Sequence, residues 1–228
     1  MNIAVIPARG GSKRIPRKNI KLFGGQPMIS YAIKAAEKSK LFDHVLVSTD
    51  DAEIIEIANH FGAETPFVRS AELATDYADT ASVIAHAIQS CEKLGWNFSN
   101  VCCIYPCVPF IEVEDLQGSY VCLETGDVDY CFPVTEFQSA VQRALKRNAD
   151  GFMKPFNPEF EFVRTQDLEP AYQDAGQFDW GKKEAWLTNP RIHSNGKGYL
   201  IPSWRVVDVD TPEDWGRAEQ LALVLKKY

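Results

Sequence analysis

The chain has 228 residues, of which 45% are hydrophobic and 24% are charged. This composition is ordinary for a globular protein, so a disordered, collagenous or coiled-coil chain is excluded. The length suits one large domain, with or without a smaller inserted unit. Lys and Arg number 24 against 31 Asp and Glu, which gives a formal net charge of −7 and argues against a general nucleic-acid-binding protein.

The sequence also argues against secretion and membrane insertion. No apolar run approaches the ~18 residues that a membrane span requires, and the run Met1–Ile6 is followed at once by Pro7 and Arg9, unlike a signal peptide. We therefore expect a cytoplasmic protein with no membrane partner. The cysteines lie in apolar segments without the spacing of a zinc site, so we expect buried reduced thiols: Cys91, Cys102, Cys103, Cys107, Cys122 and Cys131.

Strand and helix patterns alternate through the first half of the chain. Short apolar runs, typical of buried strands, occur at Asn2–Ile6, His44–Thr49, Val101–Tyr105 and Asp129–Val134. Apolar residues at helical spacing predict helices at Pro27–Lys38, Asp51–Phe61, Thr80–Leu94 and Glu112–Leu123. This alternation predicts a three-layer α/β fold with a mainly parallel sheet.

The alternation weakens from Thr135 to about Trp186, where prolines interrupt a segment rich in aromatic residues: Phe137, Phe152, Phe156, Phe160, Phe162, Tyr172, Phe178, Trp180 and Trp186. We expect an inserted antiparallel lobe in a single domain that spans residues 1–228. The aromatic side chains require burial, either on the lobe's own domain or on a partner subunit. Beyond the lobe, we expect strands at Gly198–Pro202 and Arg205–Val209 and a helix at Pro212–Lys227.

A basic glycine-rich loop follows the first strand and reads IPARGGSKRIPRKN from Ile6 to Asn19. No acid interrupts the cations between Arg9 and Lys21, so we expect them to be unpaired: Arg9, Lys13, Arg14, Arg17, Lys18 and Lys21. Gly10 and Gly11 allow a sharp turn and a close approach of backbone N–H groups to a ligand. At the carboxyl edge of a parallel sheet, this loop predicts a polyphosphate site, with a solvated basic loop as the alternative. The spacing matches neither GxxxxGK[ST] nor GxGxxG.

Two aspartates precede the last helix. Asp208 and Asp210 lie two residues apart in an expected strand, so their side chains project from the same face. Adjacent carboxylates repel unless a cation lies between them, and Mg²⁺ accepts such ligands together with substrate phosphate oxygens. The alternative is a pair of surface acids. Thr211 and Asp214 are explained separately as the cap of the helix.

Other polar residues follow predicted strands or begin predicted helices. Asp51 fits a helix cap, and Asp50 is a candidate for the ligand site. Arg69 follows an expected apolar strand at Thr65–Val68. The alternative to a place in the ligand site is an ordinary surface arginine. Thr80 fits a helix cap. No Ser-His-Asp or Cys-His arrangement is evident, which disfavours covalent catalysis.

The basic loop resembles the signature loop of the sugar-acid cytidylyltransferases, the family that includes CMP-N-acetylneuraminate synthetase. The resemblance continues, in the family's order, at VSTDD (Val47–Asp51), RSAELATD (Arg69–Asp76) and VDVDTPED (Val207–Asp214). The segments RIPRKN, IYPCVPF and DAGQFDWGKKEAW are most similar to family members that act on pseudaminic acid. The sialic acid enzymes tend to carry a Gln-Pro-Thr-Ser-Pro type of sequence where this chain has Tyr-Pro-Cys-Val-Pro.

The resemblance implies an enzyme of nucleotide-diphospho-sugar transferase-like fold that uses CTP, an acidic nine-carbon sugar and Mg²⁺. It implies metal binding by Asp208 and Asp210, which with Arg9 and Lys18 are the expected catalytic residues. The expected nucleotide contacts are Ala8, Arg9, Gly10, Gly11, Ser12, Lys13, Lys18, Asn19, Arg69, Thr80 and Ser82.

The resemblance also implies a homodimer in which the lobe reaches the partner's sugar. Cations of the expected lobe are then candidates for the sugar carboxylate: Lys146, Lys154, Arg164 and Arg143. The alternatives are a CMP-N-acetylneuraminate, CMP-legionaminate or CMP-Kdo synthetase, or a non-catalytic CTP-binding regulator.

Overall fold

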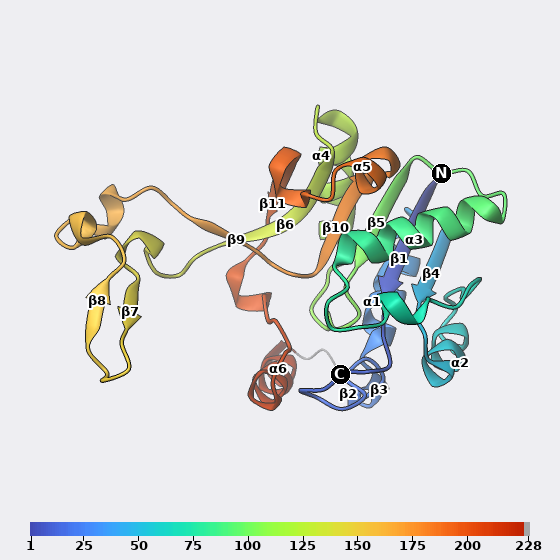
Figure 1. Cartoon of the computed structure of the whole chain (residues 1–228), viewed down its shortest axis with the longest axis horizontal. Helices are drawn as coiled ribbons and strands as arrows, with labels where there is room; N and C mark the ends of the chain where they lie inside the picture. The colour runs from blue at the N-terminus through green and yellow to red at the C-terminus, as the bar shows by residue number, and fades with distance from the viewer. Residues whose placement is uncertain (226–228) are drawn as a thin grey trace.

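A seven-stranded sheet forms the centre of the structure, a computed structural model that describes residues 1–225 (Figure 1). The strand order is β11-β6-β10-β5-β1-β4, and β9 pairs with β6. The bounds of these strands are β1 Asn2–Pro7, β4 His44–Ser48, β5 Asn100–Ile104, β6 Tyr130–Glu136, β9 Tyr172–Asp174, β10 Phe178–Lys182 and β11 Gly196–Leu200. The β1–β4, β1–β5 and β6–β11 pairs are parallel, whereas β9 and β10 run antiparallel to their neighbours. The predicted mainly parallel sheet is confirmed.

Helices cover both faces of this sheet. Successive residues of β1 point to opposite faces, and both faces are buried, which explains why the strand reads as a continuous apolar run. Ala4 and Ile6 pack in the core beneath α1 (Ile29–Ser39), α2 (Ala52–His60) and α4 (Val113–Thr125). Ile3 and Val5 pack in the core beneath α3 (Thr80–Lys93) and α5 (Lys183–Thr188). The predicted three layers are therefore confirmed.

A third apolar cluster joins the C-terminal helix α6 (Pro212–Leu225) to the N-terminal quarter of the chain. Trp215 packs with Ile15 of the basic loop and with Phe23 of the short hairpin β2 (Leu22–Phe23) and β3 (Gln26–Pro27). The cluster brings the chain segment before α6 next to the basic loop. The predicted helix is confirmed as far as Leu225, and the rest of its expected span, residues 226–227, lies outside the described residues. None of the described helices is both long and apolar enough to cross a bilayer.

Two predicted strands are wrong. The range Arg205–Val209 begins in a 3-10 turn, Ser203–Arg205, and residues 206–210 pair with no strand of the described chain. Arg205 instead turns inward and forms a buried two-pronged ion pair with Asp115 of α4. Residues 65–68 also form no strand, because Pro66 lacks the N–H group that a ladder requires; Glu64 alone bridges to Leu46.

Residues 137–171 form an arm that extends between β6 and β9, away from the rest of the chain, which we call the body (Figure 1). The arm carries the hairpin of β7 (Leu145–Arg147) and β8 (Met153–Pro155), and its two ends are joined where the Phe137 N–H donates to the Ala171 carbonyl at 2.9 Å. The expected lobe extended to Trp186, but β10 and α5 belong to the body. Trp180 and Trp186 are buried in the core there, and their indole N–H groups donate to backbone carbonyls.

Candidate functional site

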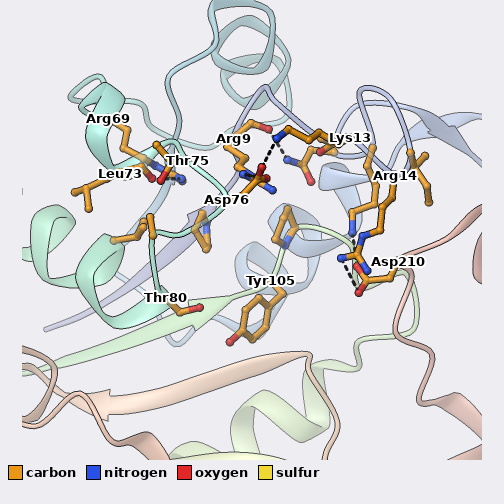
Figure 2. A pocket seen from close by; sticks show the side chains of 18 residues that line it. Arg9, Lys13, Arg14, Arg69, Leu73, Thr75, Asp76, Thr80, Tyr105 and Asp210 are labelled. Atoms are coloured by element: carbon orange, nitrogen blue, oxygen red, sulfur yellow. Dashed lines mark hydrogen bonds and ion pairs between the residues drawn. The ribbon is translucent and has the colours of Figure 1, made fainter. Parts of the chain in front are cut away.

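Two adjoining cavities open beyond the ends of β1 and β5, the edge at which open α/β sheets hold their ligands. The first, of about 270 Å³, lies between the basic loop and the start of α3 (Figure 2). The second, of about 540 Å³, lies between the turn that joins β9 to β10 and residues 206–210. Four residues line both cavities and mark where they meet: Lys18, Tyr105, Pro106 and Asp210.

The cations at the first cavity face an acid from another part of the chain. Arg9 Nη1 lies 2.6 Å from Asp76 Oδ1, and Lys13 pairs with the same carboxylate (Figure 2). Hydrogen bonds from Lys13 and Arg9 hold the pKa of Asp76 below its usual range. The expectation that the loop cations are unpaired is therefore wrong, because their partners come from elsewhere. An anionic ligand that contacts Arg9 and Lys13 in this cavity competes with the Asp76 carboxylate.

Asp210 links the basic loop to the segment before α6. Lys18 Nζ donates to the Val209 carbonyl at 2.7 Å and lies 3.2 Å from Asp210 Oδ1. Arg14 Nη2 lies 2.9 Å from Asp210 Oδ2 (Figure 2). Asp208 lines the second cavity. Partial desolvation, and then the negative charge of Asp210, raise the pKa of Asp208, so the two aspartates lie close enough to repel.

The two aspartates fit a Mg²⁺ site that a substrate completes. In the described part of the chain, no three His, Cys, Asp or Glu side chains gather into a metal site of their own. Mg²⁺ is commonly bound by one or two carboxylates with substrate phosphate oxygens and water. A cation would relieve the repulsion from Asp210, which acts together with burial to raise the pKa of Asp208. The donor chemistry of Asp208 and Asp210 therefore fits Mg²⁺ bound together with a nucleotide.

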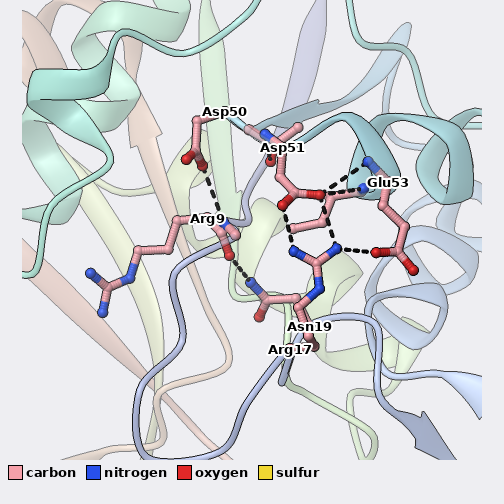
Figure 3. Close-up of polar contacts among 9 residues, drawn as sticks. Arg9, Arg17, Asn19, Asp50, Asp51 and Glu53 are labelled. Carbon is pink, nitrogen blue, oxygen red and sulfur yellow. Dashed lines mark hydrogen bonds and ion pairs between the residues drawn. The ribbon is translucent and has the colours of Figure 1, made fainter.

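Arg17 stabilises the loop itself. Its guanidinium pairs with Asp51 and Glu53 at the start of α2, with 3.0 Å between Nη2 and Asp51 Oδ1 (Figure 3). Arg17 has a left-handed backbone with φ 55°, a conformation that costs a residue other than glycine roughly 1–3 kcal/mol and that these ion pairs hold in place. Asp51 also caps α2, as predicted, by accepting from the Glu53 and Ile54 N–H groups at 3.0 and 3.1 Å.

Gly10 is required by the close approach of this same acid. A side chain at Gly10 would overlap the Asp51 carboxylate, whereas the space around Gly11 is open. The Gly10 N–H donates to Asp50 Oδ1 at 3.1 Å, and Asn19 Nδ2 donates to the Arg9 carbonyl at 2.9 Å (Figure 3). These bonds fix the backbone from which Arg9 projects into the first cavity.

Arg69 and Thr80 line another part of the first cavity (Figure 2). Arg69 is only 5% exposed and donates to the Ser48 hydroxyl at 3.1 Å and to the Ser48 carbonyl, so it is not a mobile surface arginine. Burial lowers the pKa of Arg69 to about 10. Thr80 begins α3, but the cap is Asp79, which accepts from the Ser82 N–H at 2.8 Å.

The family model described as cytidylyltransferase matches residues 3–183. The chain belongs to the cytidylyltransferase family. A pseudaminic acid cytidylyltransferase of Campylobacter jejuni is 40% identical to it, over 93% of this chain and 92% of that protein. The CMP-N,N'-diacetyllegionaminic acid synthase of Legionella pneumophila is 31% identical, over 96% and 95% of the two chains. The N-acylneuraminate cytidylyltransferase A of Danio rerio is 31% identical over 96% of this chain and 50% of its own.

Solved structures of other cytidylyltransferases share the fold. A CMP-2-keto-3-deoxy-manno-octonic acid synthetase, solved in complex with CTP, superposes with a TM-score of 0.73 over 100% of this chain and 99% of its own, at 16% identity. The 4-diphosphocytidyl-2C-methyl-D-erythritol synthase of Anaerococcus prevotii gives a TM-score of 0.64 over 97% and 98%, at 13% identity. The family and the nucleotide-transferase type of fold are thus as predicted.

The structure brings together most of the expected nucleotide contacts. Seven of them line the first cavity: Arg9, Ser12, Lys13, Lys18, Asn19, Arg69 and Thr80. Four lie outside its lining: Ala8, Gly10, Gly11 and Ser82. Ala8 is fully buried, and the Ser82 hydroxyl donates to Asp79 Oδ2 at 2.7 Å. Tyr105 is not among the expected contacts, although the sequence offers a signal for it. Tyr105 directly follows β5, and ligands of open α/β sheets bind beyond the carboxyl ends of the strands.

The expected sugar contacts do not reach either cavity of their own chain. Arg143, Lys146, Lys154 and Arg164 belong to the arm, which points away from the body (Figure 1), and they are not among the lining residues of the two cavities. Lys146 Nζ lies 5.8 Å from the centre of the Phe156 ring, and Arg164 Nε lies 2.6 Å from Asp167 Oδ2. If these cations bind a sugar, they do so in a second copy of the chain.

Proposed function

We propose that the protein transfers CMP from CTP to the anomeric hydroxyl of a nine-carbon α-keto sugar acid, with pseudaminic acid as the preferred acceptor. The observation that carries this proposal is the junction of two cavities at Lys18 and Asp210, between a cationic loop and a pair of aspartates. A triphosphate and an acceptor hydroxyl have to meet at such a junction. The 40% identity to a pseudaminic acid cytidylyltransferase supports the choice of acceptor.

In this account the first cavity holds CTP. The triphosphate displaces the Asp76 carboxylate from Arg9 and Lys13, and Lys18 contacts the phosphates at the junction. Charge-assisted hydrogen bonds of this kind are the strong ones, and a triphosphate offers more negative charge and more acceptor oxygens than the single carboxylate that it replaces. Arg69 and Thr80 then face the nucleoside end of the ligand.

The acceptor lies in the second cavity, with its anomeric oxygen directed at the α-phosphorus. A bond forms between that oxygen and the α-phosphorus, the bond from the α-phosphorus to the bridging oxygen breaks, and the hydroxyl proton passes to solvent. Asp208 and Asp210 would hold Mg²⁺, which supplies positive charge to the reacting oxygens and to the departing pyrophosphate. The chain's own task is to orient the two substrates and to place Lys18 and Arg9 against the negative charge of the triphosphate.

We further propose that the single domain, residues 1–228, assembles as a homodimer in which the arm closes the partner's sugar site. Aromatic residues of the arm remain exposed, with Phe162 94% and Phe152 70% accessible, and such side chains are typical of an interface core. Lys146, Lys154, Arg143 and Arg164 would then offer cations to the partner's acceptor. CTP as a substrate and six free cysteines fit the cytoplasm.

Co-expression tests the exchanged arm. A Lys18→Ala chain and a chain in which Lys146 and Lys154 are both replaced by Ala should each lose at least about nine-tenths of the parental activity. Mixed dimers contain one intact site, so co-purified heterodimers should regain up to about half of the parental activity per dimer, because one of two sites is complete. A monomer by light scattering at micromolar concentration, or heterodimers as inactive as the parents, would contradict the arrangement.

Initial rates with a panel of acceptors test the proposed reaction. Purified protein with CTP and Mg²⁺ should release pyrophosphate with pseudaminic acid at a kcat/KM at least about tenfold above that for N-acetylneuraminic, legionaminic or Kdo acceptors, a difference of about 1.4 kcal/mol. A higher kcat/KM for one of the other acids would reassign the substrate. CTP binding without turnover of any acid would favour a non-catalytic regulator.

A further inference from the structure

A buried carboxyl group that forms no ion pair within residues 1–225 lies next to Tyr105, at the junction of the two cavities. Asp179 of β10 is 1% exposed, and its Oδ2 accepts a hydrogen bond from the Tyr105 hydroxyl at 3.1 Å. Its Oδ1 finds no hydrogen-bond partner among residues 1–225. Burial, and then the negative charge of Asp174, raise the pKa of Asp179 to about 7, while the Tyr105 hydroxyl and His193 act in the opposite direction.

Such a group weakens the fold. A buried acid that is only half satisfied costs more than an apolar side chain of the same size in the same place. Residues with strongly shifted pKa values next to a cleft are candidates for a functional role. Asp179 lines neither cavity, so any role has to pass through a neighbour that does.

Tyr105 is that neighbour. It follows the last residue of β5 and lines both cavities, and its backbone N–H donates to the Gln177 carbonyl at 3.0 Å. In Figure 2 the ring lies at the floor of the first cavity, between Thr80 and Asp210. Thr80 lines the same cavity as Tyr105. Tyr105 is therefore held at its backbone by Gln177 and at its hydroxyl by Asp179.

We propose that Tyr105 is a specificity-determining wall between the nucleotide and the acceptor, and that Asp179 is a positioning residue that acts through the Tyr105 hydroxyl. This inference rests on the proposed CMP transfer. The other charged or polar residues at the junction, Lys18 and Asp210, serve phosphate and metal in that reaction. The orientation of the acceptor then depends on the uncharged wall beside them, and a small misplacement of a reacting group lowers the rate by one to two orders of magnitude.

Four variants test the proposal. Two quantities are measured for each: kcat/KM for pseudaminic acid, and the Kd for CTP in the absence of sugar, by calorimetry. Tyr105→Phe and Asp179→Leu should each lower kcat/KM for the sugar about tenfold while the Kd for CTP changes less than about twofold. Asp179→Asn keeps an oxygen that accepts from Tyr105, so it should stay within about threefold of the parent. The double variant that combines Tyr105→Phe with Asp179→Leu should have the same kcat/KM as Tyr105→Phe alone, because both changes remove the same hydrogen bond.

Tyr130→Phe is the matched control, since the buried Tyr130 hydroxyl donates to the Asn189 carbonyl at 2.7 Å and lines neither cavity. It should lose stability but keep parental kinetics. Parental kinetics in Tyr105→Phe, an equal weakening of CTP binding, or additive losses in the double variant would overturn the proposal. If Asp179→Leu does not fold, Tyr105→Phe decides alone. An inactive parent would instead overturn the proposed function.

Discussion

Replacing Asp208 with asparagine should lower kcat for CMP transfer by about 10²–10³-fold, the several kcal/mol that a bound metal contributes to a transition state. The fold should persist, because the change is nearly isosteric and removes a charge that both burial and the nearby Asp210 disfavour, as the raised pKa of Asp208 indicates. Asp210→Asn should be at least as severe, since Asp210 also holds Lys18 and Arg14. The measurement is a Mg²⁺ titration of initial rates together with a thermal unfolding curve.

Asp127→Asn is the control for these variants, because Asp127 lies between α4 and β6 and lines neither cavity. It should keep parental activity at every Mg²⁺ concentration. Normal turnover of folded Asp208→Asn at low Mg²⁺ would place the metal elsewhere.

Removing the Lys18 side chain should lower kcat/KM for CTP at least about tenfold, because a hydrogen bond to a charged group contributes about 1.5–3 kcal/mol. Lys18 is the loop cation that lines both cavities, so its loss should affect the bound triphosphate and the reacting phosphorus together. Steady-state kinetics at saturating acceptor measure this effect.

Lys21→Ala is a control from the same run of cations, just after the basic loop. Lys21 Nζ lies 4.2 Å from the centre of the Trp215 ring, and Lys21 lines neither cavity. The variant should bind CTP as the parent does. Unchanged CTP kinetics in a folded Lys18→Ala protein would remove Lys18 from the triphosphate site.

The sequence predicts those parts of the fold that depend on local chemistry. Burial on both faces gives β1 a continuous apolar run, and the caps at Asp51 and at Thr211 with Asp214 depend on residues two to three positions apart. The expected strand at Arg205–Val209 was wrong, and Arg205 pairs instead with an acid 90 positions away, Asp115, which no local pattern reveals.

In the candidate site too, features that depend on local sequence are predicted and those that depend on tertiary packing are not. The basic loop is visible in the sequence, but the acids that face it, Asp76 and Asp210, come from segments whose approach depends on tertiary packing. Trp180 and Trp186 were expected in the lobe because they lie in the aromatic-rich segment, yet both are buried in the core of the body. The sequence carries no local signal that an antiparallel strand returns to the sheet after an insertion. The Tyr105–Asp179 hydrogen bond joins two residues that are 74 positions apart in the sequence.

Phosphorus NMR of the reaction mixture tests the central claim, that the two cavities are the donor and acceptor sides of one transfer to the sugar. Purified protein, CTP, Mg²⁺ and pseudaminic acid should convert the three phosphate signals of CTP into one phosphodiester signal and pyrophosphate, in a ratio of one product to one pyrophosphate. CDP with a sugar phosphate would mean attack at the γ-phosphorus, and an unchanged CTP spectrum would mean that no transfer occurs; either result would contradict the account.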